Sequence, residues 1–178
     1  GTAAALGATP GFVFLGDPNG VSPIAWSAEG NQNNVGFGGS VASAGDVNGD
    51  GFSDVIVGAE LFSNVQTGEG RAFVFHGSAA GLLPSAARTL EPNQAGAAFG
   101  HSVASAGDVN GDGFSDVIIG ANFFDAVAMD VGAVVVFQGG DGAAGLPRQL
   151  TQDFGGLRGA GAMVSLPGVL GERVVNAT

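Results

Sequence analysis

The sequence predicts an all-β fold made of repeated four-stranded units. The segment 37–59 recurs almost unchanged at 99–121, which is 62 positions later in the chain. The same offset carries Phe75-His-Gly77 onto Phe137-Gln-Gly139. A period of this length suits a four-stranded blade better than the common helical repeats. The composition, with 34 Gly, seven Pro and 45% hydrophobic residues, favours short strands and tight turns. We therefore interpret the chain as a series of β-propeller-type blades.

One complete blade, residues 37–91, shows the residue types expected of four successive strands. Gly39–Gly45 is a run of small residues, which suits a crowded inner strand. Asp54–Gly58 is β-branched without polar alternation, as expected of a strand buried on both faces. The apolar and aromatic residues of Arg71–His76 predict a third strand. Ser85–Glu91 mixes polar and apolar residues, which predicts an outer strand exposed to water.

The remaining segments of this single unit, residues 1–178, read as further copies of the blade. Residues 99–151 repeat the complete blade. Residues 11–30 match its two outer strands, at Gly11–Gly16 and Ile24–Ser27. Residues 154–178 form a degenerate partial blade, with the inner strands at Gly161–Gly168 and Glu172–Ala177 and with Val169–Gly171 in place of the acidic loop. The total is about three blades.

Three blades are too few to close, because propellers typically contain four to eight, and open strand edges invite pairing. The chain is therefore expected to be a partial propeller completed by the remainder of a longer chain. The alternative is half of a homodimeric ring, in which the end strands of one chain complete a blade of its partner.

Charge and composition restrict the partners. Acidic residues outnumber basic ones by 16 to 5, the formal net charge is -11 and no lysine is present, so nucleic acid and anionic membranes would be repelled. The absence of cysteine excludes disulfides and thiolate metal sites. No apolar run is long enough for a membrane span, and no signal peptide is visible. Because the sequence starts at Gly without Met, we expect a processed or excised piece of a secreted protein.

Two acidic loops follow the small-residue strands, and their spacing predicts two calcium sites. Calcium takes about 6–8 oxygen ligands, and short acidic residues at alternate positions can point inward around it. Positions 1, 3, 5 and 9 would ligate through side chains, and position 7 through its backbone carbonyl. Gly51 and Gly113, at position 6, supply the sharp turn. The candidate ligands are Asp46, Asn48, Asp50, Phe52 and Asp54 in the first loop, and Asp108, Asn110, Asp112, Phe114 and Asp116 in the second.

Other interpretations of the loops are weaker. An EF-hand would need a bidentate Glu at position 12 within a helix, whereas Val57 and Ile119 stand there in β-type runs. Magnesium resists the replacement of so many of its waters. Asn-Gly and Asp-Gly clusters also form plain turns, but each loop would then hold three unneutralised carboxylates.

The run Phe-Gly, strand, Asp-x-Asn-x-Asp-Gly-x-x-Asp, Val-Ile-x-Gly-Ala resembles the FG-GAP repeat, the blade unit of the integrin α-subunit propeller and of many bacterial extracellular proteins. The resemblance covers Phe37–Gly77 and Phe99–Gly139 and is weak at both ends. It implies a cation in the loop between the first two strands of each blade, bound by the ligands named above. It also implies an extracellular or cell-surface location and, for many members, a role in adhesion. Members usually have seven blades, so blade number sets this chain apart.

We expect a calcium-stiffened, non-catalytic binding or assembly module whose partner is a protein or a glycan. Gly100-His-Ser-Val-Ala104 is similar to a hydrolase nucleophile elbow, but the fifth position is Ala and no strand-to-helix context follows. His76 corresponds to Gln138 and is interpreted as a blade-edge residue. A lectin is the alternative, with Trp26, Phe123 and Phe124 as candidate sugar contacts.

Overall fold

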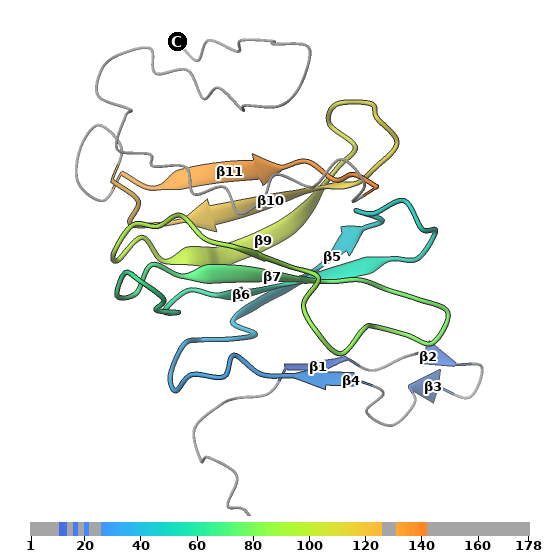
Figure 1. Cartoon of the computed structure of the whole chain (residues 1–178), viewed down its shortest axis with the longest axis horizontal. Coiled ribbons are helices and arrows are strands. Elements are labelled where there is room, and N and C mark those ends of the chain that lie inside the picture. Colours follow the sequence, from blue (N-terminus) through green and yellow to red (C-terminus); the bar gives the residue numbers. More distant parts are fainter. Residues whose placement is uncertain (1–10, 14–15, 18–19, 22–25, 126–130, 142–178) are drawn as a thin grey trace, which may run out of the picture.

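A computed structural model describes residues 11–13, 16–17, 20–21, 26–125 and 131–141 (Figure 1). The regular elements of this part are β-strands, which confirms the all-β prediction, and none of it forms a helix long and apolar enough to cross a membrane. The strands are β1 Gly11–Val13, β2 Gly16–Asp17, β3 Gly20–Val21, β4 Trp26–Ala28, β5 Ser40–Gly45, β6 Asp54–Ala59, β7 Arg71–Phe75, β8 Arg88–Leu90, β9 Phe99–Gly107, β10 Asp116–Ala121 and β11 Ala133–Phe137. The strands predicted within 142–178 lie outside the described residues.

The first blade is a four-stranded antiparallel sheet in the order β5-β6-β7-β8. Val57 pairs with Val41 on β5 and with Phe73 on β7, and Phe73 pairs with Thr89 on β8. The two central strands are largely buried, as their apolar runs predict, whereas Thr89 on the outer strand is exposed. The predicted succession of inner, central and outer strands is therefore confirmed.

The second blade repeats this arrangement with the three described strands in the order β11-β10-β9. Ile119 pairs with Val103 and with Val135, the residues that stand 62 positions after Val41 and Phe73. The repeat in the sequence is thus also a repeat of strand register. The fourth strand expected for this blade, before residue 151, falls outside the described part of the chain.

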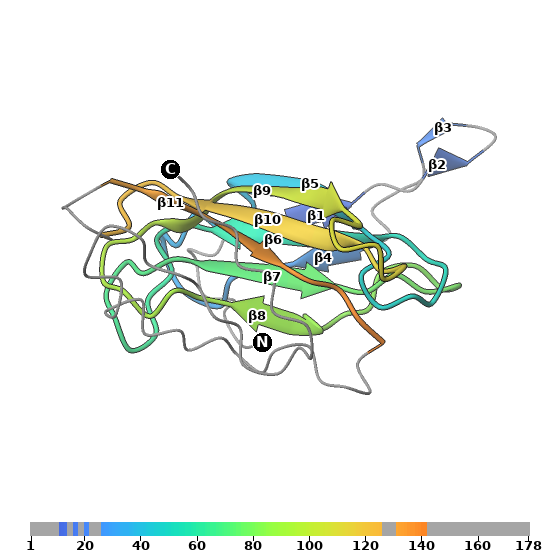
Figure 2. The ribbon, with the colours of Figure 1, turned by 90° about the horizontal axis from the view of Figure 1, so that it is seen from above.

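At the amino-terminal side, β1 and β4 form a two-stranded antiparallel sheet in which Val13 pairs with Trp26. This pairing joins the two segments that were predicted to be the outer strands of a partial blade. Between them lies a small hairpin, β2 with β3, which the sequence did not predict and which projects from the rest of the described structure (Figure 2).

Three of the sheets stack face to face, with the β5–β8 sheet between the β1–β4 sheet and the β9–β11 sheet (Figure 1). Alternate residues of β6 supply the two interfaces, because successive strand residues point to opposite faces. Ile56 belongs to the apolar cluster shared with the second blade, where Phe99, Val117, Ile119 and Phe137 are buried. Val57 and Ala59 belong to the cluster shared with Trp26 and Ala28 of β4. The core therefore consists of two separate layers.

The central strand β6 of the first blade approaches β9, the inner strand of the second blade, closely at Gly58. A Cβ atom on Gly58 would lie 2.0 Å from the carbonyl oxygen of Gly100 on β9, and the hydroxyl of Ser40 donates to the same oxygen at 2.7 Å. For Gly120, the equivalent of Gly58, the three nearest atoms to an added Cβ would all belong to Ser102 of its own blade. The small residues of the inner strands β5 and β9 therefore allow the two blades to approach each other closely.

We expect Gly58→Ala to destabilise the protein by about 1–3 kcal/mol, the usual range for overpacking, because the new methyl group collides with backbone of the next blade. Gly120→Ala is the matched control, since it introduces the same methyl group against a rotatable serine. Urea unfolding of both variants tests this, and equal losses of stability would contradict the assignment of Gly58 to the interface.

Candidate metal sites

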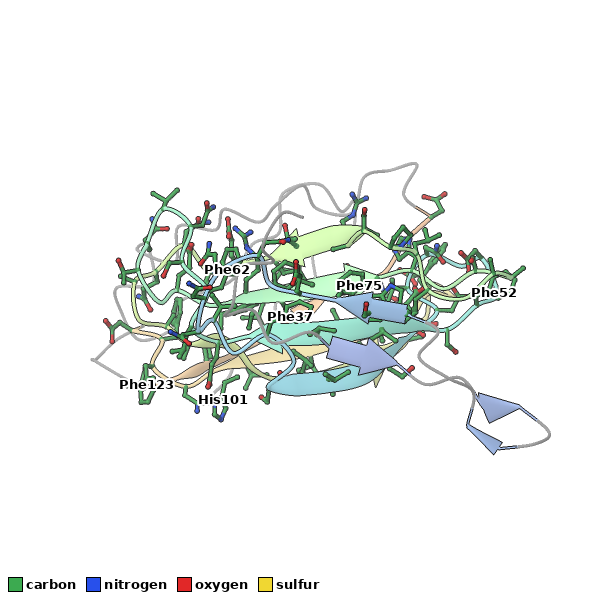
Figure 3. All side chains as sticks on the ribbon, turned by 90° about the horizontal axis from the view of Figure 1, so that it is seen from below. Phe37, Phe52, Phe62, Phe75, His101 and Phe123 are labelled. Carbon is green, nitrogen blue, oxygen red and sulfur yellow. The ribbon has the colours of Figure 1, made fainter. Side chains whose placement is uncertain are left out.

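The two acidic loops lie at the same end of the stacked sheets, where β5 turns into β6 and β9 turns into β10. Phe52 marks this end in Figure 3, and His101 and Phe123 mark the opposite end. The inner strands run in the same direction in both blades, so equivalent loops emerge side by side. The two sets of predicted ligands are therefore neighbours in space.

In the first loop, the carboxylate of Asp46 is surrounded by backbone donors. Its Oδ1 accepts hydrogen bonds from the backbone N–H groups of Gly49 at 2.7 Å and Asp50 at 3.0 Å, and its Oδ2 accepts one from Gly51 at 2.8 Å. This arrangement closes the loop around position 1. Gly49 and Gly51 adopt positive φ angles of 73° and 88°, which glycine tolerates at little cost.

The second loop has the same conformation. Asp108 Oδ1 accepts from Gly111 at 2.7 Å and from Asp112 at 3.1 Å, and Asp108 Oδ2 accepts from Gly113 at 2.8 Å. These hydrogen bonds, led by that from Gly113, lower the pKa of Asp108 below its ordinary value. In both loops the carboxylate at position 1 therefore accepts the same three backbone hydrogen bonds.

Positions 3 and 5 are also paired in both loops. Asn48 Nδ2 donates to Asp50 Oδ2 at 2.8 Å, and the backbone N–H of Phe52 donates to Asp50 Oδ1 at 2.9 Å. The bond from Phe52 and then that from Asn48 lower the pKa of Asp50. In the second loop, Asn110 Nδ2 donates to Asp112 Oδ2 at 2.7 Å. In both loops the carboxylate at position 5 is thus exposed and accepts hydrogen bonds from neutral donors.

Position 9 differs, because Asp54 and Asp116 are fully buried. Asp54 Oδ2 accepts from the backbone N–H of Val47, and Asp54 Oδ1 accepts from that of Gly77, both at 2.8 Å. Burial raises the pKa of Asp54, and these two backbone donors oppose the shift. Asp116 accepts in the same way from Val109 and Gly139, also at 2.8 Å. Each carboxylate therefore ties its loop to the end of the third strand.

The donor set fits calcium chemically. The side-chain candidates offer carboxylate and amide oxygens only, which are the ligands that a hard cation prefers. A carboxylate has about four lone-pair sites, so Asp54 and Asp116 retain acceptor capacity beside their two backbone donors. Among the described residues, however, no three Asp, Glu or His side chains are already grouped as a metal centre. The loops hold the candidate ligands on one short turn, with their oxygens engaged by backbone and amide N–H groups.

A histidine of the same blade contacts the first loop, which the sequence did not predict. His76 Nδ1 lies 3.2 Å from Asn48 Nδ2, so the residue interpreted as a blade-edge histidine contacts a candidate ligand. Its position at the end of the third strand, beside Gly77, is the signal that could have indicated this contact. The second loop has Gln138 at the corresponding place.

The features considered for catalysis or sugar binding occupy other parts of the fold. The segment Gly100–Ala104 lies within β9, so its strand-to-helix context is absent and the interpretation as an inner strand is confirmed. His101 Nδ1 is 2.5 Å from Glu60 Oε2. Phe124 is buried, and the ring of Trp26 packs edge-to-face on Phe75 at 4.7 Å between centroids. Of the three lectin candidates, Phe123 is the exposed one.

A second acidic cluster lies where the 60–70 loop meets the linker to the second blade. Arg71 forms an ion pair with the buried Glu91 and stacks over the ring of Phe62 at 4.1 Å. Glu69 is fully buried, and its Oε1 accepts from the backbone N–H of Asn64 at 2.9 Å. Burial, followed by the neighbouring Glu91, raises the pKa of Glu69. Val131 and Ala133 replace Glu69 and Arg71 in the second blade, so this cluster is specific to the first.

Comparison with known proteins identifies the repeats. The FG-GAP repeat model matches residues 37–75 and 99–137, which contain the first three strands of each of the two blades described above. The chain is 38% identical to integrin alpha pat-2 of Caenorhabditis briggsae over 114 residues, which cover 62% of this chain and 9% of the relative. It is 37% identical to integrin alpha-3 of Cricetulus griseus over 125 residues, covering 70% of this chain and 11% of the relative. For integrin alpha-3 of Mus musculus the figures are 34% over 142 residues, 79% and 12%. The matched part thus spans about a tenth of these curated relatives.

Buried and exposed acidic residues of the loops should differ in how much they contribute to the stability of the calcium-free protein. In excess chelator we expect Asp54→Ala to cost about 2 kcal/mol or more, because it leaves the N–H groups of Val47 and Gly77 without their acceptor. Asp50→Ala, at an exposed position, is the control and should change the stability little under the same conditions. Urea unfolding measures both, and equal effects would contradict a structural role for Asp54.

Proposed function

Since the chain carries two FG-GAP repeats and is distantly similar to integrin alpha subunits over part of its length, we propose that it is a calcium-stabilised segment of an extracellular β-propeller. Its two loops bind one Ca²⁺ each, and the ion serves structure rather than catalysis. The observation that carries this proposal is the matching conformation of two all-oxygen loops, 46–54 and 108–116, in each of which the carboxylate at position 1 accepts three backbone hydrogen bonds.

Electrostatics supports the structural role. Each loop gathers three carboxylates within nine residues, and their mutual repulsion opposes the closed loop. A divalent cation relieves the repulsion and joins the end of one strand to the start of the next. Extracellular modules of this type bind calcium with dissociation constants of about 10⁻⁴–10⁻³ M. Sites this weak fill where calcium is abundant, which favours a location outside the cytoplasm.

The outward face of the second blade supports a longer propeller. On the first blade, Ala72 and Val74 are 0% and 3% exposed, because the second blade covers them. Their counterparts Val134 and Val136 are 69% and 39% exposed. An apolar face of this kind fits another blade of the same type, and we propose that the partial blade predicted at 154–178, completed by the remainder of a longer chain, supplies it. A second copy of this chain is the alternative source.

A rigid, calcium-stiffened ring segment is suited to binding. The connecting loops at its two ends are exposed and can present a surface to a protein or a glycan. We favour a protein partner and an adhesive or assembly role. A lectin function has less support. Of the three candidate sugar contacts, Trp26 and Phe124 pack in the apolar clusters, and Phe123 is the exposed one.

Calcium should stabilise the folded chain by mass action. At a free calcium concentration 100-fold above the dissociation constant, each site contributes about 2.7 kcal/mol, so chelation should lower the melting temperature markedly. The double variant Asp50→Ala, Asp112→Ala should melt at the same temperature with and without calcium. Calorimetric melting of both proteins in millimolar calcium and in chelator tests this. A wild-type melting temperature indifferent to chelator would rule out a structural ion.

The source of the additional blade is testable by mass. We expect the chain alone to be monomeric in solution, near 17.3 kDa by light scattering, and to gain stability when flanking repeats are included. A species of twice that mass that persists on dilution would instead indicate a two-chain ring, and Val134→Asp with Val136→Asp should then return it to the monomer.

A further inference from the structure

The two acidic loops contact each other directly through backbone groups. The backbone N–H of Ser115 in the second loop donates to the carbonyl oxygen of Asp46 in the first at 2.9 Å. The backbone N–H of Asp46 donates in return to Ser115 Oγ at 3.2 Å. Asp46 is position 1 of its loop, and Ser115 stands between the candidate ligands Phe114 and Asp116. A reciprocal pair of hydrogen bonds therefore joins the two sets of candidate ligands.

Side-chain packing reinforces this contact. The ring of Phe114 lies against Gly49, where an added Cβ atom would be 2.5 Å from the ring. Beyond the loop, the backbone N–H of Gly140 donates to the carbonyl oxygen of Val47 at 2.8 Å. Val47 is accordingly only 4% exposed, whereas its counterpart Val109 in the second loop is 58% exposed. The second blade thus encloses the first loop along much of its length.

The equivalent side of the second loop has no such neighbour in the described part of the chain. An added Cβ atom on Gly111, the counterpart of Gly49, would meet nothing within 4 Å. Gly49 and Gly111 have φ angles of 73° and 75°, so their backbone conformations are matched. The two loops are alike in sequence and conformation and differ in what covers them.

From these contacts we infer that the two calcium loops are energetically coupled, so that filling one raises the affinity of the other. This inference rests on the proposed binding of calcium. An ion in the second loop would fix the backbone of Phe114 and Ser115, because the carbonyl of Phe114 and the carboxylate of Asp116 are among its ligands. Ser115 and Phe114 would then hold Asp46 and Gly49 in the closed loop. The first loop would then lose less conformational entropy when it binds its own ion, and this reduced cost is a source of positive cooperativity.

Coupling of binding free energies is reciprocal, so each site must affect the other by the same factor. The effect can be measured site by site with the whole chain by two-dimensional NMR, following the backbone amides of Gly51 and Gly113 during a calcium titration. Asp112→Ala disables the second loop and should weaken calcium binding at the first by about fivefold or more, the lower end of typical coupling. Asp50→Ala should weaken the second loop by the same factor.

Matched variants test whether the contact itself carries the coupling. Gly49→Ala drives a methyl group into Phe114, whereas Gly111→Ala imposes the same backbone strain with no neighbour to displace. In the Gly49→Ala background, Asp112→Ala should no longer change the affinity of the first loop. In the Gly111→Ala background, the full factor should remain. Ser115→Ala, with Ser53→Ala as its control, is a milder pair that preserves the fold if Gly49→Ala does not.

The outcomes separate the coupling from the proposed function. Saturable calcium shifts at both amides, with affinities unchanged by Asp112→Ala and by Asp50→Ala, would overturn the coupling and leave calcium binding intact. Coupling that survives both Gly49→Ala and Ser115→Ala would overturn the assignment to this contact. No calcium-dependent shift at either amide in millimolar calcium would overturn the proposed function and the coupling together.

Discussion

Two buried carboxylates, Asp54 and Asp116, anchor the part of the fold on which the proposed function depends. Each one accepts backbone hydrogen bonds from the start of its acidic loop and from the residues after the third strand. A buried carboxylate is costly unless it is paired with donors, and these positions satisfy that demand with two amides each. Because these hydrogen bonds fix the residue at which each loop ends, the other acidic residues of the loop are confined to one short turn. The same constraint shapes both loops identically.

The acidity of the chain follows in part from these loops, which hold six of its sixteen acidic residues. Hydrogen bonds from Phe52 and Asn48 lower the pKa of Asp50, and backbone hydrogen bonds, led by that from Gly113, lower the pKa of Asp108. Hydrogen bonds of this kind favour the charged state without removing the charge itself. A divalent cation can neutralise several nearby carboxylates because it is coordinated by their oxygens. The charge pattern and the proposed calcium sites thus have one physical origin.

Stacking of equivalent blades gives equivalent residues different environments. Ile56, Ala72 and Val74 are buried because a second blade lies on them, whereas Val134 and Val136 remain exposed. Val47 and Val109 differ in the same way within the loops. Each interface joins one side of a blade to the opposite side of the next blade. The described segment contains two main blades, so the apolar side of the second blade that carries Val134 and Val136 stays exposed. The proposals of a longer ring and of coupling between loops both arise from this directional stacking.

The sequence alone determined the repeat, the order of the strands and the two candidate loops. These features are local or periodic: the 62-residue offset, the β-branched run at Asp54–Gly58 and the alternate acidic residues can each be read without tertiary contacts. Tertiary structure alone decided that Asp54 is a buried anchor, that Glu69 and Glu91 gather around Arg71, and that Ser115 meets Asp46. It also revealed the β2–β3 hairpin, whose two-residue strands carry too little pattern to be predicted. Contacts between residues about 70 positions apart depend on how one sheet rotates and packs on the next, and no local pattern encodes that geometry.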